Sequence, residues 1–263
     1  FKQKTAYEIR LSLVGSEMCI RDRLITLKGI KALQKADAVL YDALVNPELL
    51  AYIPTHVPQV FVGKRFGDHY LQQSEINDLI IEYAFKYGNI VRLKGGDSFV
   101  FGRGYEEIEY AMSFGIHTEV VPGISSALGV PALLNIPMTH RGDSESFWVL
   151  TGTTKAHLLS TDIELAAKST ATVVILMGMH KLAQIIDIFQ QAGKEETPIA
   201  IIQNGTLPNE LVVVGKINNI LAQAQDAQIT SPAIIVIGQT VQKYLHLHTK
   251  NTYPYEQLVS HIY

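Results

Sequence analysis

The sequence predicts an α/β protein made of two α/β domains with mostly parallel sheets. The chain has 263 residues, of which 47% are apolar and 18% charged, which is typical of one large or two ordinary packed domains. From Leu24 onward, short apolar runs alternate with segments whose apolar residues recur at helical spacing. This alternation favours strands joined by helices. Turn residues without periodicity at Ile136–Asp143 place the boundary between the two domains there.

The first domain, residues 24–140, is expected to contain four helices and four strands. Apolar residues at helical spacing predict a helix over 25–36. Ser74 and Gly88 are placed to begin and end a helix over 75–87. The other expected helices cover 105–114 and 124–134, and the expected strands cover 38–41, 60–62, 89–93 and 117–121.

The second domain, residues 146–241, repeats the alternation. Its expected strands cover 147–150, 172–177, 199–203, 211–214 and 233–238, and its expected helices cover 161–168, 180–192 and 217–224. The polar and aromatic residues after Val241 predict a terminal helix or a loose extension.

The charge and cysteine content limit the classes of function. A formal net charge of −3 gives no general reason to expect nucleic acid or an anionic membrane as a partner. The single cysteine, Cys19, leaves no cysteine-based metal site or disulfide framework, as is usual for a cytosolic enzyme. No zinc or phosphate-loop signature and no long apolar run occur in the sequence, so neither a metal nor a membrane span is expected. Six basic residues beside glycines or turn residues nevertheless favour an acidic ligand: Lys64, Arg65, Arg92, Lys94, Arg103 and Arg141.

The most specific stretch is Val91–Glu107, VRLKGGDSFVFGRGYEE, which predicts a strand, a glycine-rich turn and a helix. Gly95 and Gly96 remove two Cβ atoms in a row, so backbone amides there can approach a ligand closely. Asp97 follows as a hydrogen-bond acceptor, and Arg103 supplies a planar cation that suits carboxylates. Parallel α/β proteins place small cofactors at such turns. An aspartate in the third place distinguishes this turn from the Gly-x-Gly-x-x-Gly of dinucleotide-binding enzymes.

Several other polar residues follow predicted strands. Asp42 and Lys64 would form an acid/base pair if both projected into one cleft, although a turn aspartate and a solvated lysine are the better interpretations from spacing alone. His69 could bind a substrate, but a loop histidine is more often merely exposed. Met177 is interpreted as a core residue, and Asn204-Gly-Thr206 as a turn.

Together these motifs resemble the tetrapyrrole methylases that use S-adenosyl-L-methionine, and in particular their uroporphyrinogen-III C-methyltransferase branch. The resemblance runs from about Leu24 to Val241. It rests on LITLK at 24–28, Tyr41-Asp42, GKR at 63–65, Val91–Glu107, VPGI at 121–124, IPMTHR at 136–141 and NGT at 204–206. The Lys-Arg pair and the Phe-Gly-Arg-Gly-x-Glu-Glu block favour this branch over cobalt-precorrin, diphthine or ribosomal-RNA ribose methylases.

The resemblance implies a ligand cleft between the two domains and a role for each matching residue. Asp42 matches the family's proton acceptor and Lys64 its proton donor. The residues that match contacts with the methyl donor are Gly95, Gly96, Asp97, Val100, Ser125, Ser126, Met177 and Gly205. The substrate's many carboxylates would be bound by Arg65, His69, Arg103 and Arg141.

The implied reaction is two successive methyl transfers to C2 and C7 of uroporphyrinogen III. The product, precorrin-2, would enter sirohaem or cobalamin biosynthesis. The resemblance also implies a cytoplasmic homodimer that binds no nucleic acid and no membrane.

Residues 1–23, ending LVGSEMCIRDR, fit no part of this pattern and resemble a translated sequencing-adapter read-through. This segment is expected to pack poorly or as an isolated helix. The family has a first strand and a Gly-x-Gly-Pro-Gly-Asp-Pro loop immediately before the segment that matches 24–28, whereas this chain has Arg21-Asp22-Arg23. Both features are therefore expected to be missing, with donor binding and activity reduced. Ser98 also replaces a usual proline, which loosens its turn.

Two other classes of function remain open at this point. One is a related methylase that acts on another tetrapyrrole or on RNA, which a product assay with uroporphyrinogen III would separate. The other is a non-catalytic binding or scaffold protein without the first glycine loop. A Gly-Pro-Gly coding stretch upstream of the codon for Leu24 would favour the enzyme over this second class.

Overall fold

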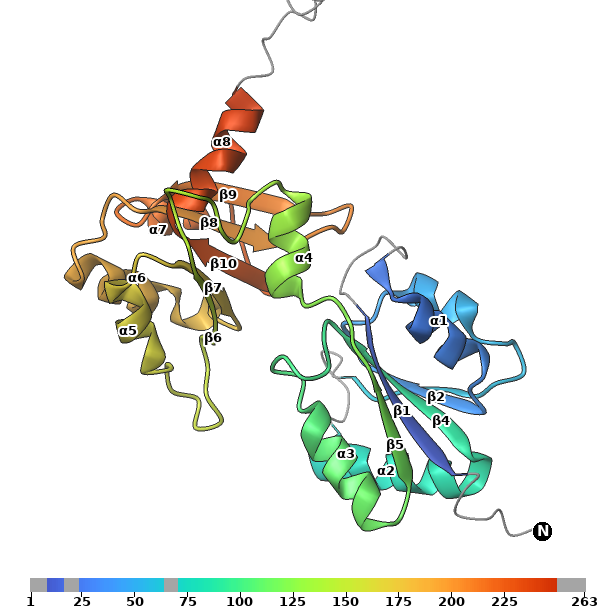
Figure 1. The fold of residues 1–263 in the computed structure, drawn as a ribbon. Helices are drawn as coiled ribbons and strands as arrows, with labels where there is room; N and C mark the ends of the chain where they lie inside the picture. The colour runs from blue at the N-terminus through green and yellow to red at the C-terminus, as the bar shows by residue number, and fades with distance from the viewer. Residues whose placement is uncertain (1–8, 17–23, 64–70, 250–263) are drawn as a thin grey trace, which may run out of the picture. The chain divides into compact units, whose positions relative to one another are not determined.

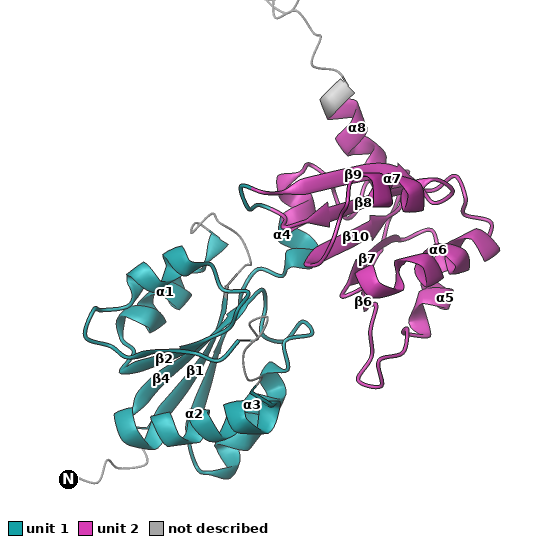
Figure 2. Cartoon of the chain, turned by 180° about the vertical axis from the view of Figure 1, so that it is seen from behind, with its two compact units in different colours: residues 1–129, 206–208 teal, residues 130–205, 209–263 magenta. Residues whose placement is uncertain are grey.

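The computed structural model describes residues 9–16, 24–63 and 71–249, and the chain divides into two compact units (Figure 2). Unit 1 comprises residues 1–129 and 206–208, and unit 2 comprises residues 130–205 and 209–263. The division falls inside helix α4 (Ser126–Leu133), whereas the sequence placed the boundary at Ile136–Asp143.

Unit 1 is built on a five-stranded parallel sheet with the strand order β3-β2-β4-β1-β5 (Figure 1). Its strands are β1 (Arg10–Ser16), β2 (Ala38–Tyr41), β3 (Gln59–Phe61), β4 (Asn89–Gly95) and β5 (His117–Val121). Strand β4 lies in the middle, and its residues 90–94 are all buried. The parallel sheet predicted for the first domain is confirmed.

Helices cover both faces of this sheet. They are α1 (Leu27–Gln34), the 3-10 helix η2 (Pro47–Tyr52), α2 (Gln73–Tyr87) and α3 (Gly104–Ser113). One hydrophobic cluster joins Leu40 and Ile90 of the sheet to α2 and α3, and a second joins Val39 and Val91 to α1 and η2. Residues of β4 at even positions therefore face α2 and α3, which fixes the direction of Arg92 and Lys94 as well.

Helix α2 begins two residues earlier than the sequence predicted. The backbone N–H of Gln72 donates to the Glu75 carboxylate, so Gln72 is the N-cap and Ser74 lies inside the first turn. Gly88 ends the helix as predicted, with a φ of +103°.

Strand β1 corrects the expectation for the amino-terminal segment. Arg10–Ser16 pairs in parallel with β4 and with β5, and Leu11, Leu13 and Val14 are fully buried. The expectations of a missing first strand and of poor packing are therefore wrong for residues 9–16. The apolar LSLV run can occupy the position between β4 and β5 whatever its origin, because a central strand of a parallel sheet is buried on both faces and requires apolar residues. Residues 17–23, which include Arg21-Asp22-Arg23, lie outside the described residues.

Unit 2 contains a five-stranded sheet with the order β6-β7-β10-β8-β9. Its strands are β6 (Phe147–Thr151), β7 (Thr172–Leu176), β8 (Pro198–Gln203), β9 (Leu211–Lys216) and β10 (Ala233–Ile237). Strands β6 and β7 pair in parallel, but the pairs β7–β10, β10–β8 and β8–β9 are antiparallel. The prediction of a mostly parallel sheet is therefore wrong for this half. The connection from β8 to β9 contains no helix, and a short connection produces an antiparallel hairpin.

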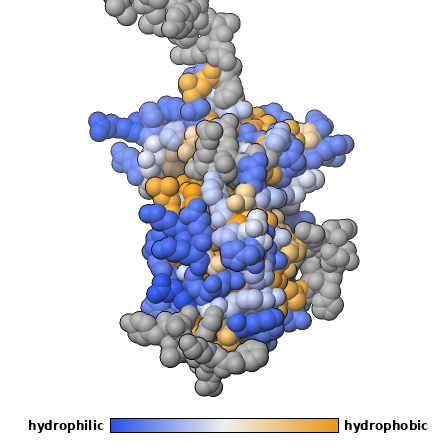
Figure 3. Space-filling view, turned by 90° about the vertical axis from the view of Figure 1, so that its right-hand side faces the viewer, coloured by the Kyte–Doolittle hydropathy of each residue, from blue (hydrophilic) through white to orange (hydrophobic). Residues whose placement is uncertain are grey.

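The helices of unit 2 pack on a core rich in isoleucine. Those that form this core are α5 (Asp162–Lys168), α6 (Leu182–Gln191) and α7 (Ile220–Asp226). The unit also contains α8 (Gln242–Thr249) and the short 3-10 helices η3 (Met179–Lys181) and η4 (Gln239–Val241). Ile175, Ile201 and Ile235 of the sheet are buried against Ile163 and Ile185 of α5 and α6. The face drawn in Figure 3 is largely hydrophilic, with hydrophobic residues in small groups. None of the described helices is long and apolar enough to span a bilayer.

The substitution Leu11→Ala tests whether β1 is an integral strand. Leu11 is fully buried in the cluster that faces α2 and α3, so the truncation is expected to lower the free energy of unfolding by about 2–5 kcal/mol. Leu27→Ala is the control, since Leu27 is 77% exposed and its truncation is expected to cost less than about 0.5 kcal/mol. Urea denaturation measures both, and equal costs would contradict a buried β1.

Candidate ligand site at the carboxyl edge of the first sheet

Three glycines meet where β1, β4 and β5 end. A Cβ on Gly15 would lie 2.7 Å from both the Gly96 carbonyl oxygen and the Gly123 backbone nitrogen. A Cβ on Gly123 would lie 2.3 Å from the Gly96 carbonyl oxygen. Side chains do not tolerate contacts this short with backbone atoms, so the three backbone segments can meet only because the residues at positions 15 and 123 lack a Cβ.

The two adjacent glycines of the predicted turn have different reasons to be glycine. A Cβ on Gly95 would lie 2.8 Å from the Leu44 Cβ and 2.9 Å from the Leu44 carbonyl oxygen, so Gly95 is needed for packing. Gly96 has a φ of +76°, and apart from Gly96 and its chain neighbours no atom of the described residues lies within 4 Å of the place where its Cβ would be. One side of the Gly96 backbone is therefore open, as a close approach to a ligand requires.

The Asp97 carboxylate fixes the shape of this turn. Its Oδ1 accepts a hydrogen bond from the Phe99 N–H at 2.8 Å, and its Oδ2 accepts one from the Gly123 N–H at 3.1 Å. The first bond closes the turn after β4, and the second ties that turn to the loop after β5. Asp97, predicted as a donor contact, thus holds Gly96 and Gly123 in place through backbone groups.

The other predicted donor contacts of unit 1 lie at the same edge of the sheet. Ser125 is buried and precedes α4, where its Oγ accepts a hydrogen bond from the Ala127 N–H at 3.3 Å. Ser126 is the first residue of α4 and is partly exposed. Val100, in the turn after β4, is 36% exposed. Exposed apolar side chains at this edge also include Leu44, Phe99 and Phe101.

Two predicted donor contacts belong to unit 2. Met177 directly follows β7, and Gly205 follows β8. Both strands run antiparallel to β10, so both residues lie at the same edge of the second sheet. Met177 is 51% exposed with a φ of +56°, so its interpretation as a core residue is wrong. Gly205 is buried, and a Cβ there would lie 2.5 Å from the Val130 side chain.

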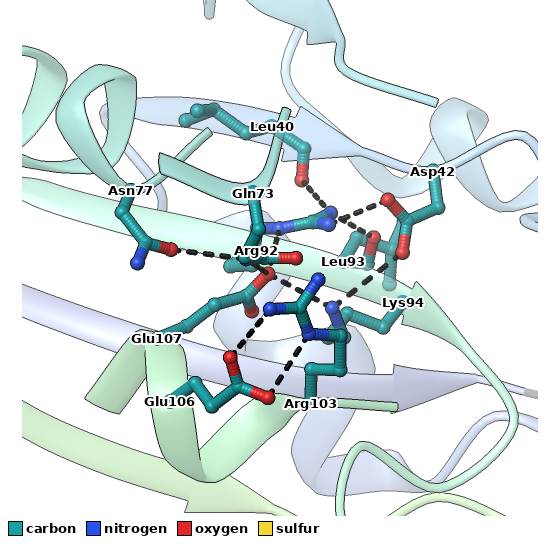
Figure 4. A network of polar contacts seen from close by, with 10 residues as sticks. All are labelled: Leu40, Asp42, Gln73, Asn77, Arg92, Leu93, Lys94, Arg103, Glu106 and Glu107. Atoms are coloured by element: carbon teal, nitrogen blue, oxygen red, sulfur yellow. Dashed lines mark hydrogen bonds and ion pairs between the residues drawn. The ribbon is translucent and has the colours of Figure 1, made fainter. Parts of the chain in front are cut away.

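Asp42 follows β2 and faces two cations of β4 (Figure 4). The Arg92 Nη2 lies 2.5 Å from the Asp42 Oδ1, and the Lys94 Nζ lies 3.7 Å from the Asp42 Oδ2. The Asp42 side chain is 25% exposed, whereas those of Arg92 and Lys94 are 1% and 6% exposed. A ligand at this edge can therefore reach Asp42, but not the cations behind it.

The prediction that Arg92 and Lys94 belong to ligand-binding loops is wrong. Both side chains point from β4 toward α2 and α3, where the Glu107 Oε1 lies 2.9 Å from the Lys94 Nζ and 3.3 Å from the Arg92 Nε. Gln73 donates to the same oxygen at 3.1 Å. Sequence reasoning missed Glu107 and Gln73. The available signal was two basic residues at alternate positions of an apolar strand, because buried cations require a buried anion.

The environment of Lys94 changes its acidity. Burial lowers the pKa of the Lys94 ammonium, and the charge of Arg92 lowers it further, while Glu107 and Asp42 act in the opposite direction. The two carboxylates thus favour the charged form of this amine in a place where burial disfavours it.

The predicted substrate-binding residues fall into two groups. Arg65 and His69, like the predicted proton donor Lys64, lie in the segment 64–70, outside the described residues. Arg103 is exposed and forms a two-point pair with Glu106, with distances of 3.0 Å and 2.5 Å, and this bond raises the pKa of Arg103. Arg141 is exposed in unit 2, in a turn closed by pairing of His140 with Ser144.

An open glycine turn, a partly exposed carboxylate and exposed apolar side chains at the carboxyl edge of a parallel sheet define a small-ligand site of an α/β protein. Residues 20–221 match the Tetrapyrrole (Corrin/Porphyrin) Methylases. The chain belongs to this family, as its motifs predicted.

Individual relatives agree with this assignment. Uroporphyrinogen-III C-methyltransferases of Methanocaldococcus jannaschii and Synechocystis sp. are 42% and 44% identical over 83% of this chain, which covers 91% and 84% of their lengths. The siroheme synthase of Actinobacillus pleuropneumoniae serotype 7 is 44% identical over 83% of this chain. The chain spans 45% of that siroheme synthase, less than half of its length.

Solved structures show the same fold. The uroporphyrin-III C-methyl transferase from Thermus thermophilus complexed with S-adenyl homocysteine is 32% identical, with a TM-score of 0.76, and the match covers 89% of this chain and 99% of that one. A cobalt precorrin-4 methyltransferase, at 22% identity and a TM-score of 0.78, shares the fold.

The substitution Asp97→Asn tests whether this carboxylate holds the turn together. An amide has one acceptor oxygen, so one of the two backbone N–H groups loses its partner, and the free energy of unfolding is expected to fall by about 1–3 kcal/mol. Asp78→Asn is the control, because exposed Asp78 accepts from the Tyr110 hydroxyl and asparagine keeps an acceptor for it, so a change below about 0.5 kcal/mol is expected. Chemical denaturation measures both variants, and a neutral Asp97→Asn would remove this role.

Proposed function

We propose that the protein is an S-adenosyl-L-methionine-dependent methyltransferase that methylates uroporphyrinogen III at C2 and C7 to give precorrin-2. The observation that carries the proposal is the open Gly96 turn beside the partly exposed Asp42, in a chain of the tetrapyrrole methylase family. The relatives named uroporphyrinogen-III C-methyltransferase support the substrate. The Thermus thermophilus neighbour complexed with S-adenyl homocysteine supports the donor.

The residues of unit 1 fit the methyl donor. Gly95 and Gly96 present backbone groups without side chains, and a Cβ on Gly96 would occupy space that is now open. Leu44 and Val100 supply exposed apolar surface, and Ser126 supplies a hydroxyl at the start of α4. When bound, S-adenosyl-L-methionine supplies an electrophilic methyl group. The contacts of Met177 and Gly205 with the donor remain predictions from the family resemblance.

Asp42 is proposed to accept the proton that leaves the macrocycle after methylation. Its carboxylate reaches the surface while Arg92 and Lys94 hold it from behind, so its position is fixed before a substrate binds. Lys64 is proposed as the proton donor. Arg65, His69, Arg103 and Arg141 are proposed to bind the substrate's carboxylates, for which arginine is well suited.

Finer features of the proposal follow from the family resemblance. The product is proposed to serve sirohaem or cobalamin biosynthesis, and the protein to act as a cytoplasmic homodimer without nucleic acid or metal. Residues 1–23 are proposed to be of foreign origin, with residues 9–16 filling the place of the family's first strand. Light scattering of the purified protein would test the dimer.

The activity itself is tested by incubating the protein with S-adenosyl-L-methionine and uroporphyrinogen III, followed by mass spectrometry. The expected product carries two additional methyl groups. The variant Asp42→Asn is expected to lower kcat about 100-fold or more, because general-base catalysis contributes about that factor. Folded protein that leaves uroporphyrinogen III unchanged but methylates another tetrapyrrole or RNA would contradict the proposed substrate.

A matched pair of glycine substitutions tests the donor site. Gly96 and Gly115 have φ angles of +76° and +75°. At both positions, the part of the chain that the structure describes places no atom beyond the chain neighbours within 4 Å of where a Cβ would be. An alanine at either place is expected to cost about 1–2 kcal/mol of stability because both would adopt a left-handed backbone. Gly115 precedes β5, at the opposite edge of the sheet. Calorimetry is expected to show S-adenosylhomocysteine binding weakened about tenfold or more, about 1.4 kcal/mol, in Gly96→Ala alone. Equal affinities in the two variants would place the donor elsewhere.

A further inference from the structure

Glu107 is a fully buried carboxylate that the proposed reaction does not use. It lies in the first turn of α3, and its exposed fraction is 0%. Donors from two elements converge on its Oε1, namely Lys94 at 2.9 Å and Arg92 at 3.3 Å from β4, and Gln73 at 3.1 Å from α2 (Figure 4). Its Oε2 is buried and has no hydrogen-bond partner among the described residues. Glu107 therefore accepts hydrogen bonds from both cations with the same oxygen, Oε1.

The two cations lie between two carboxylates. Arg92 contacts Asp42 at 2.5 Å and Glu107 at 3.3 Å, and Lys94 contacts Glu107 at 2.9 Å and Asp42 at 3.7 Å. Arg92 and Lys94 carry two positive charges, and Asp42 and Glu107 carry two negative charges, so the formal charges of the four side chains cancel. Among the described residues, the charged groups that face Asp42 are Arg92 and Lys94, with Glu107 directly behind them.

The distances of Lys94 show which carboxylate holds it. The ammonium forms a hydrogen bond with Glu107 but lies beyond hydrogen-bond distance from Asp42. Without the charge of Glu107, Asp42 would be the only carboxylate of the described residues within 4 Å of the nitrogen atoms of Arg92 and Lys94. Two positive charges would then act on Asp42 without the buried Glu107 carboxylate that offsets them, and this makes a carboxylate a weaker proton acceptor.

We propose that Glu107 is a positioning residue that keeps Asp42 able to accept a proton, by holding Lys94 away from Asp42 and by offsetting its charge. The importance of this effect for catalysis rests on the proposed function, in which Asp42 is the proton acceptor. Glu107 itself touches neither solvent nor a ligand, because its side chain is completely buried. Its effect on the reaction passes through Arg92 and Lys94.

A purely structural role for Glu107 makes a different prediction. Removing one partner of a buried ion pair leaves an uncompensated charge and destabilises the fold. That effect lowers the fraction of folded protein, but it does not change how the protonation of Asp42 depends on pH in the molecules that remain folded. The pH dependence of Asp42 therefore separates the two roles.

The first test uses Glu107→Gln in the full chain, with Glu109→Gln as the matched control on an exposed position of the same helix. Carbon-13 NMR of protein labelled at aspartate carboxyl carbons follows Asp42, whose signal is identified by its loss in Asp42→Asn. The Asp42 signal is expected to respond to pH differently in Glu107→Gln than in the parent and in Glu109→Gln, because one buried negative charge behind Asp42 is lost. Titration of Asp42 at the same pH in all three proteins would overturn the proposal.

A charge-balanced variant keeps the test decisive if Glu107→Gln does not fold. Lys94→Met combined with Glu107→Gln removes one charge of each sign, so Asp42 again faces one net positive charge. Its titration is expected to return to that of the parent. A response of the Asp42 signal to pH in this double variant that matches Glu107→Gln rather than the parent would contradict the charge-offset role.

The second test measures methyl transfer to uroporphyrinogen III as a function of pH. In Glu107→Gln, kcat is expected to fall about tenfold and its acidic limb to move to lower pH, with the KM values unchanged. An unchanged kcat profile would overturn the proposal. A parent protein that is folded but inactive would overturn the proposed function instead, while the titration of Asp42 still decides the role of Glu107.

Discussion

The structure of the site depends on the close approach of three backbone segments at Gly15, Gly96 and Gly123. Their separations leave no room for a Cβ at positions 15 and 123. The approach brings the ends of β1, β4 and β5 together, and Asp97 holds two of them by accepting from the Phe99 N–H of its own turn and from the Gly123 N–H of the loop after β5. The same approach leaves one face of Gly96 open. A packing constraint and a place for a ligand therefore arise from one feature of the sheet.

The charged residues of β4 add a second constraint, on the other side of the same strand end. Buried cations are costly unless carboxylates compensate them, and a buried ion network seldom adds net stability over an apolar core. Here the compensation comes from the fully buried Glu107 of α3 and from Asp42, which reaches the surface. The position of this network behind Asp42 gives it a chemical use that an apolar core could not provide.

Local sequence was sufficient to predict most helices and strands of unit 1 and the glycine turn after β4. The stretch Val91–Glu107 combines an apolar run, paired glycines and helical spacing, and each of these depends on neighbours in sequence. The burial of Arg92 and Lys94 depends on Glu107 and Gln73, which reach them from other elements, so spacing alone misassigned both cations to a surface loop. The antiparallel pairing of β10 and the insertion of β1 are likewise set by long-range contacts, and both contradicted the predictions.

The Gly96 turn at the end of β4 is proposed to bind the methyl donor. Chemical-shift mapping with nitrogen-15-labelled protein and S-adenosylhomocysteine tests this claim residue by residue. Donor binding at this turn is expected to give saturable shifts of the amide signals of Gly95, Gly96 and Gly123, with the signal of Gly115 unchanged. Saturable shifts that leave these three amides unchanged would contradict it.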